Sequence, residues 1–233
     1  MIIAIDTSTG TAGLAVTQDD TILAEMSWQC GQNHTTQFLP ALSFILGQLK
    51  LSLSDARGIV VARGPGSYNG LRVGLGTAKG LAFSLNIPLV GISTLASSSF
   101  QAASRDPGFP VCAVMNAGRG EIAAAVYRQD GSSWLPVVPE HLASVASICS
   151  LIQTTTIFCG EYLPSVAIEI QQRLGEKAVF VSGAALVRRA SFLAVLGSRR
   201  LQAHDYDDPS TLQPLYLRAP SITQPKEPHQ ERK

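Results

Sequence analysis

The chain has 233 residues, a formal net charge of +1, 15% charged residues and 45% hydrophobic residues. This length allows one large domain or two small ones with ample core, and the near-neutral charge argues against a global basic field that would hold nucleic acid. The start, MIIAIDTS, lacks the basic segment of a signal peptide, and no apolar run is long enough to span a membrane. We therefore expect a cytoplasmic protein without membrane contact, whose four scattered cysteines stay reduced in the core.

The first fifty residues predict a meander of three strands followed by a helix. The first strand ends at Asp6, and three hydroxyl residues follow it in a turn. Residues 34–50 predict a helix, with Pro40 in or near its first turns, where proline costs least. The apolar stripe of this helix consists of Phe38, Leu42, Ile45 and Leu49.

A glycine-dense turn precedes a second helix with very little charge. After a short strand at 58–63, the turn-forming residues are Gly64, Pro65, Gly66 and Gly70. The helix is expected over 70–86, where Arg72 and Lys79 are the only ionised residues. Gly70, Gly74 and Thr77 form a stripe of small residues beside an apolar stripe of Leu71, Leu75, Ala78, Ala82 and Leu85.

The second half of the chain weakly repeats the first. A strand at 87–93 and an Ala/Ser-rich helix complete an α/β arrangement, and with an offset of 110 Asn116 falls on Asp6. We therefore predict a duplicated α/β fold with an N-terminal lobe at 1–104, a smaller C-terminal lobe at 105–219 and a disordered tail at 220–233. Within the C-terminal lobe, helices are expected at 142–152, 163–174 and 184–196, with a strand beginning at 156.

Asp6, Thr7 and Ser8 form the candidate phosphate site. A carboxylate at the end of a strand can hold magnesium, and hydroxyls with backbone N–H groups can face a phosphate. The alternative is that Asp6 and Thr7 only cap a hairpin turn. Asn116, at the matching position of the second half, supplies no negative charge, so independent phosphoryl transfer is disfavoured and the site is interpreted as vestigial.

Other catalytic and metal sites are poorly supported. The turn GPGSYNG lacks the Lys-Ser/Thr of a Walker loop, and Ser67 has no GxSxG context. No histidine belongs to an HxxxH or HExxH pair, so we expect no metal, no cofactor and no peptidase chemistry. Arg188 and Arg189 are most simply explained as part of a solvated helix face, with contact to a phosphate backbone as the less favoured reading.

The two charge-poor helices favour a partner that packs on them as a four-helix bundle. The alternative is burial of both helices under the protein's own second lobe. The predicted interface residues are Phe38, Leu42, Ile45, Leu49, Leu71, Gly74, Leu75, Ala78 and Ala82. On this reading, Leu75→Glu or Gly74→Trp abolishes partner binding and leaves the subunit folded.

Four segments resemble the TsaB (YeaZ) family: AIDTST at 4–9, NHTTQFLPAL at 33–42, GPGSYNGLRVGL at 64–75 and PLYLR at 214–218. The resemblance is strongest up to about Leu95. It implies a two-lobed actin-like (ASKHA, ribonuclease H-like) fold, older labels of glycoprotease, and a non-catalytic subunit. Two departures stand out: Asn116 replaces the usual aspartate of the second lobe, and CGE at 159–161 replaces a glycine-rich turn.

The resemblance also implies partners. TsaB-like proteins bind and activate TsaD through their two N-terminal helices, and TsaD carries out the threonylcarbamoylation of adenosine 37 in tRNAs that read ANN codons. TsaE joins the larger complex, tRNA is contacted mainly through the complex, and the isolated protein can form a homodimer through the same face. The alternative from another class is a small actin-like ATP-binding phosphotransferase that uses Asp6.

Overall fold

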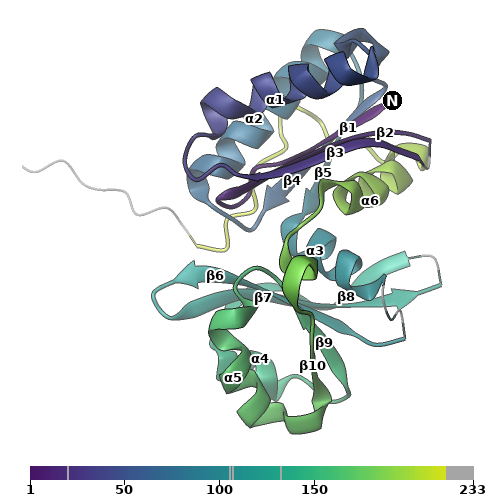
Figure 1. Cartoon of the computed structure of the whole chain (residues 1–233). Coiled ribbons are helices and arrows are strands. Elements are labelled where there is room, and N and C mark those ends of the chain that lie inside the picture. Colours follow the sequence, from purple (N-terminus) through teal and green to yellow (C-terminus); the bar gives the residue numbers. More distant parts are fainter. Residues whose placement is uncertain (20, 105, 107, 132, 219–233) are drawn as a thin grey trace, which may run out of the picture.

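The computed structural model describes residues 1–19, 21–104, 106, 108–131 and 133–218, which form two lobes, each built on a five-stranded mixed sheet (Figure 1). The strand orders are β3-β2-β1-β4-β5 and β10-β9-β6-β7-β8. The strands of the first sheet are β1 (Ile2–Asp6), β2 (Thr11–Gln18), β3 (Thr21–Gln29), β4 (Gly58–Gly64) and β5 (Leu89–Ser93). Those of the second are β6 (Val111–Gly118), β7 (Glu121–Asp130), β8 (Ser133–Ala143), β9 (Thr156–Cys159) and β10 (Ala178–Phe180).

Both sheets have the same topology. In each, an antiparallel meander of three strands is extended by two parallel strands: β4 and β5 follow β1, and β9 and β10 follow β6. Asp6 lies at the end of β1, and Asn116 lies near the end of the equivalent strand β6. The repeated topology confirms the predicted duplicated, actin-like α/β fold.

Helices cover both faces of the first sheet. Helices α1 (His34–Leu49) and α2 (Tyr68–Leu85) lie side by side on the face turned away from the second lobe (Figure 1). Because side chains alternate along a strand, Ile3 and Ile5 of β1 pack in the core under α1 and α2, whereas Ala4 faces α6 (Ala190–Gln202). A Cβ at Gly197 of α6 would lie 2.3 Å from Val60, so only glycine permits this close packing.

The second sheet is covered by α3 (Thr94–Ala103) on one face, and by α4 (Val145–Ser150) and α5 (Leu163–Leu174) on the other. Thus α3, from the first half of the sequence, packs on the second sheet, and α6, from the second half, packs on the first. Helices thus cross between the lobes on both sides of the predicted boundary at 104/105, which stays a prediction. The physical reason is that the central strands of both sheets are buried on both faces, and each needs a second helical layer. The predicted tail at 220–233 lies outside the described residues.

Two element predictions are wrong. The segment expected as a helix at 142–152 begins as the end of β8, and only α4 is helical. The helix expected at 184–196 is broken: a short 3-10 turn at Gly183–Leu186 precedes an extended stretch, and α6 starts at Ala190. Pro40 lies inside α1, in the second turn of the helix, near the predicted place.

Candidate functional site

A buried ionic network lies where the two lobes meet. Asp6 ends β1 and is 3% exposed. Its Oδ1 accepts hydrogen bonds from the backbone N–H of Ser8 (2.9 Å) and from the Ser8 hydroxyl (2.6 Å). Its Oδ2 accepts from Nε of Arg188 at 3.0 Å. The turn after β1 therefore uses its own hydroxyl and amide groups to hold the carboxylate.

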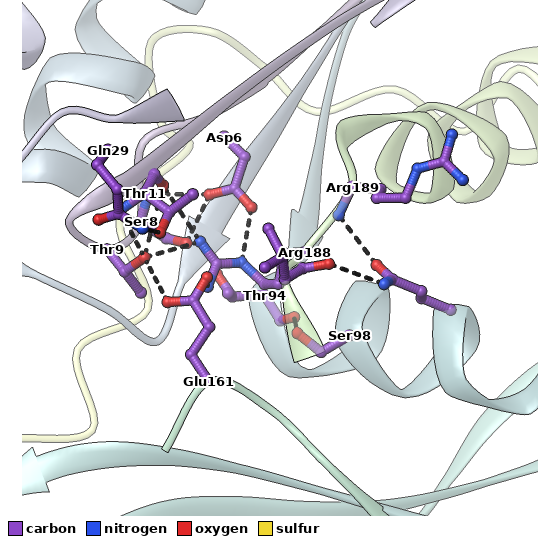
Figure 2. Close-up of polar contacts among 12 residues, drawn as sticks. Asp6, Ser8, Thr9, Thr11, Gln29, Thr94, Ser98, Glu161, Arg188 and Arg189 are labelled. Carbon is purple, nitrogen blue, oxygen red and sulfur yellow. Dashed lines mark hydrogen bonds and ion pairs between the residues drawn. The ribbon is translucent and has the colours of Figure 1, made fainter. Parts of the chain in front are cut away.

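Arg188 reaches this network from the extended stretch before α6. Its guanidinium lies between Asp6 and Glu161 (Figure 2), with Nη1 2.9 Å from Oε1 of Glu161, and Nη2 donates to the Thr9 hydroxyl at 3.0 Å. The side chain is 5% exposed, which corrects the prediction that Arg188 belongs to a solvated helix face. The break between the 3-10 turn and α6 turns this side chain inward.

Helix α3 fixes the backbone on both sides of Arg188. The amide nitrogen of Gln101 donates to the carbonyl of Val187 at 2.9 Å, and its amide oxygen accepts from the N–H of Arg189 at 2.9 Å. Gln101 is itself buried. The polar end of one α3 side chain thus satisfies a backbone carbonyl and a backbone N–H on either side of Arg188.

Glu161 brings the second lobe into the network. It lies in the turn between β9 and α5, and its Oε2 accepts a hydrogen bond from the Thr9 hydroxyl at 3.0 Å. Gly160 precedes it with φ +114°, and a Cβ there would lie 2.1 Å from the carbonyl oxygen of Val114. The CGE turn at 159–161, which departs from the family pattern, therefore supplies the acid that joins the lobes through Arg188.

The charges of the network stabilise one another. Burial by itself would raise the pKa of Asp6, but the Arg188 charge and the hydrogen bonds from Arg188 and Ser8 outweigh it, so the pKa lies below its usual value. Burial opposes the charged form of Arg188, yet Asp6 and Glu161 raise its pKa. Asp6 and Arg188 are therefore both ionised at neutral pH.

The residues present do not fit a magnesium–nucleotide site. Asp6 is neutralised by a guanidinium, and the Thr7 hydroxyl donates to the carbonyl of Gly70 at 2.7 Å. On the opposite lobe, Oδ1 of Asn116 accepts from the N–H of Gly118 at 2.8 Å. Within the described ranges, no group of three or more His, Cys, Asp or Glu residues is placed to hold a metal ion.

The glycine turn presses α2 against the loop after β1. Gly64 has φ +115°, and a Cβ at Gly70 would lie 2.1 Å from the carbonyl oxygen of Thr7. A Cβ at Gly66 would lie 2.3 Å from the carbonyl oxygen of Ser8. Any larger residue at Gly66 or Gly70 would push the start of α2 away from the loop that carries Asp6.

The predicted interface residues are largely covered in the isolated chain. Their side chains point inward and form the core of the first lobe, because the apolar stripes of α1 and α2 cover their own sheet. Gly74 packs against the Thr7 hydroxyl, and Leu49 is half-buried at the edge of the core. The buried residues are Phe38, Leu42, Ile45, Leu71, Gly74, Leu75, Ala78 and Ala82. In the isolated chain these side chains stabilise the first lobe, and their place at an interface stays a prediction.

Different apolar residues remain exposed on the same two helices. Leu39 and Phe44 of α1 are 52% and 60% exposed, and Phe83 of α2 is 85% exposed. Gly47, Gly76 and Gly80 are exposed, and a Cβ at each would have no neighbour within 4 Å. We call these six residues the outer helix face. Sequence reasoning missed them because they lie off the main apolar stripes.

Two substitutions that the sequence favours as interface probes should instead unfold the first lobe. Leu75→Glu would bury a carboxylate at a site that is 3% exposed, and Gly74→Trp would place a ring where a Cβ alone lies 2.2 Å from Oγ1 of Thr7. We expect each to lower the free energy of unfolding by about 4 kcal/mol or more. Urea denaturation followed by circular dichroism measures this loss. A variant within about 1 kcal/mol of the wild type would contradict the burial.

Comparison with known proteins identifies the family. The chain is 32% identical over 220 residues to "tRNA threonylcarbamoyladenosine biosynthesis protein TsaB" of Bacillus subtilis, covering 93% of each chain. The chain belongs to the TsaB family. The crystal structure of YeaZ from Pseudomonas aeruginosa superposes with a TM-score of 0.80 at 22% identity, covering 93% of this chain and 99% of the other, so TsaB-family members share this two-lobed fold.

The chain is also similar to proteins named as the transferase. The family model described as "TsaD: tRNA N6-adenosine threonylcarbamoyltransferase" matches residues 28–222. A protein of that name from Syntrophus aciditrophicus is 38% identical over 89 residues, which cover 37% of this chain and 26% of the relative. In the described part of this TsaB-family chain, no helix is long and apolar enough to cross a membrane. The chain has a role in tRNA threonylcarbamoyladenosine biosynthesis, as the name of its TsaB relatives states.

Proposed function

We propose that this protein is a non-catalytic accessory subunit that binds and activates a TsaD-type transferase for the threonylcarbamoylation of adenosine 37 in tRNA. The observation that carries the proposal is the outer helix face: an apolar surface on α1 and α2 that the protein's own second lobe does not cover (Figure 1). Exposed apolar patches of this kind mark interaction sites in soluble proteins.

The chemistry of the outer helix face suits another pair of helices. Helix α1 carries no ionised side chain along its exposed side, and α2 carries only Arg72 and Lys79. The exposed Gly76 and Gly80 leave room for a partner helix to approach the backbone closely, while Phe44 and Phe83 can enter the grooves of that helix. Because the transferase is related in sequence, its equivalent helices can pack on α1 and α2 about a pseudo-twofold axis and form a four-helix bundle.

The absence of a catalytic role is part of the proposal, and Arg188 supports it. The guanidinium takes up the charge of Asp6, the carboxylate that a phosphotransferase would need for its cation. We further propose that the protein works in the cytoplasm, where its four buried cysteines stay reduced, that TsaE joins through the complex, and that two copies can pair by the same face when the transferase is absent.

Co-purification tests the partner. The tagged full chain, expressed with the TsaD-type transferase of its own organism, should retain that transferase at a one-to-one ratio and should be required for threonylcarbamoylation of tRNA. If the transferase elutes alone and is fully active without this protein, the proposal fails.

Calorimetry tests the rival phosphotransferase. We expect titration of the isolated chain with magnesium and ATP to give no binding heat up to about 1 mM nucleotide, because Asp6 is already paired with Arg188. A magnesium-dependent dissociation constant below about 100 μM would revive the enzyme alternative.

A further inference from the structure

A cavity of about 730 Å³ opens between the lobes at the start of α2. It is lined mainly by the glycine turn with Tyr68, by the end of β6 and the turn after it with Asn116 and Arg119, and by the C-terminal segment with Tyr216 and Arg218. A smaller cavity of about 390 Å³ adjoins it and shares Gly66, Met115, Asn116 and Ala117. The volume is typical of sites that bind small molecules or single nucleotides.

The charged residues that line the larger cavity are arginines. Among the described residues that line it, Arg119 and Arg218 are charged and none is a carboxylate. Arg218 is held in place because Nη1 donates to the carbonyl of Ala117 at 2.9 Å and Nη2 pairs with Glu121. Glu121 offsets the charge of Arg218, but Arg72, Arg119 and Arg218 together outnumber this acid, and the excess of positive charge favours an anionic ligand, above all phosphate.

Two tyrosines form an ordered aromatic wall of the cavity. The rings of Tyr68 and Tyr216 lie with centroids 5.2 Å apart, and the residues are 41% and 36% exposed. Arg72 holds Tyr68 from outside: its guanidinium lies over the ring at 5.2 Å from the centroid, and Nη1 donates to the phenol oxygen at 3.0 Å. Ordered, half-exposed aromatic rings beside arginines are the groups on which unpaired bases stack.

The aromatic wall also leads toward the outer helix face. Arg72 is exposed on α2, one turn before Gly76, so a strand that stacks on Tyr216 and passes Arg72 would reach the edge of the proposed partner. A free mononucleotide would occupy the cavity but would not extend to Arg72, which is outside its lining. The arrangement therefore favours a nucleic-acid strand over a free nucleotide.

We infer that this cleft, with Tyr216, Tyr68, Arg119, Arg218 and Arg72, binds an unpaired stretch of RNA and holds it beside the transferase. The inference rests on the proposed function, because it identifies the RNA as the tRNA substrate. A base stacks on Tyr216, whose ring Tyr68 supports, and the arginines contact phosphates. The binding discriminates single-stranded from paired RNA and does not read a specific sequence.

Fluorescence anisotropy of a labelled single-stranded RNA ten-mer with the isolated full chain at low salt tests the inference. Tyr216→Ala should weaken binding about tenfold, whereas Tyr216→Phe, which keeps the ring, should bind as the wild type does. Tyr206→Ala, at a 44% exposed tyrosine that does not line the cavity, is the matched control and should change nothing. Arg119→Ala should reduce the slope of log affinity against log salt by about 0.7, and Arg173→Ala, on α5, should leave it unchanged.

Three results would overturn the inference: no RNA binding by the wild type, equal binding by Tyr216→Ala and the wild type, or displacement of the RNA by AMP at the same concentration as by unlabelled ten-mer. The last would assign the cleft to a free nucleotide. Retention of the transferase during co-purification does not depend on these measurements, so failure of the RNA site and failure of the proposed function are distinguishable.

Discussion

Arg188→Met is expected to lower the free energy of unfolding by about 3–5 kcal/mol. The substitution keeps an unbranched side chain of similar length but leaves Asp6, which is 3% exposed, without its cation. It also removes the link from Asp6 to Glu161 and so weakens the contact between the lobes. Since small domains are stable by only about 5–15 kcal/mol, this loss is readily measured by urea denaturation.

Two variants separate the buried charge from other effects. Arg173→Met breaks an exposed pair with Glu169 on α5 and should cost at most about 0.5 kcal/mol. Asp6→Asn combined with Arg188→Met removes both buried charges and should recover part of the stability. If Arg188→Met is as stable as Arg173→Met, the network does not hold the lobes together.

The same network predicts how stability depends on pH. The pKa of Asp6 is lower in the folded state than in the unfolded state, so ionised Asp6 contributes to the free energy of unfolding. This contribution is complete above the unfolded-state pKa of about 3.9 and is lost as the pH falls through the folded-state pKa. Without Arg188, burial should raise the pKa of Asp6. Lowering the pH then protonates the buried carboxylate and removes the cost of its unpaired charge in the variant. The difference in unfolding free energy between wild type and Arg188→Met should therefore shrink as the pH falls from 7 to about 4.

Local sequence patterns predicted much of the fold. The helix at 163–174 agrees with α5 residue for residue, and the offset that places Asn116 on Asp6 reflects the repeated topology of the two sheets. These features depend on short-range periodicity and on spacing along the chain. The exchange of α3 and α6 between the lobes depends on which sheet each helix finally covers, and no local pattern contains that information.

The candidate site was less predictable. Asp6 and Arg188 are 182 positions apart, so neither charge indicates the other in the sequence. The apolar stripes of α1 and α2 correctly indicated that these side chains are buried. They did not indicate which surface buries them, which is the protein's own sheet. A weaker pattern indicates the exposed apolar surface. Phe44 and Phe83 lie on the faces opposite to the stripes, where a helix that packed only on its own sheet would carry polar residues.

Phe83→Glu is expected to abolish binding of the TsaD-type transferase. The side chain is 85% exposed in the isolated subunit, so a glutamate there meets only water and should change the unfolding free energy by less than about 0.5 kcal/mol. In a helix bundle, the same carboxylate would be buried against an apolar partner without a cation. Aromatic anchors at interfaces typically contribute about 2–4 kcal/mol, which corresponds to a loss of affinity of roughly 30-fold to 1,000-fold. Co-purification and surface-binding kinetics measure the loss.

Ile168→Glu is the matched control for Phe83→Glu. Ile168 is 75% exposed on α5 of the second lobe, so the substitution makes the same chemical change to an exposed apolar residue far from the outer helix face. It should leave the affinity for the transferase unchanged. Gly80→Trp, which fills the space that a partner helix needs beside α2, should reproduce the effect of Phe83→Glu without adding a charge. If Phe83→Glu and Gly80→Trp bind as the wild type does, while Ile168→Glu does not, the partner sits on the second lobe, and the exposed side of α1 and α2 has another role.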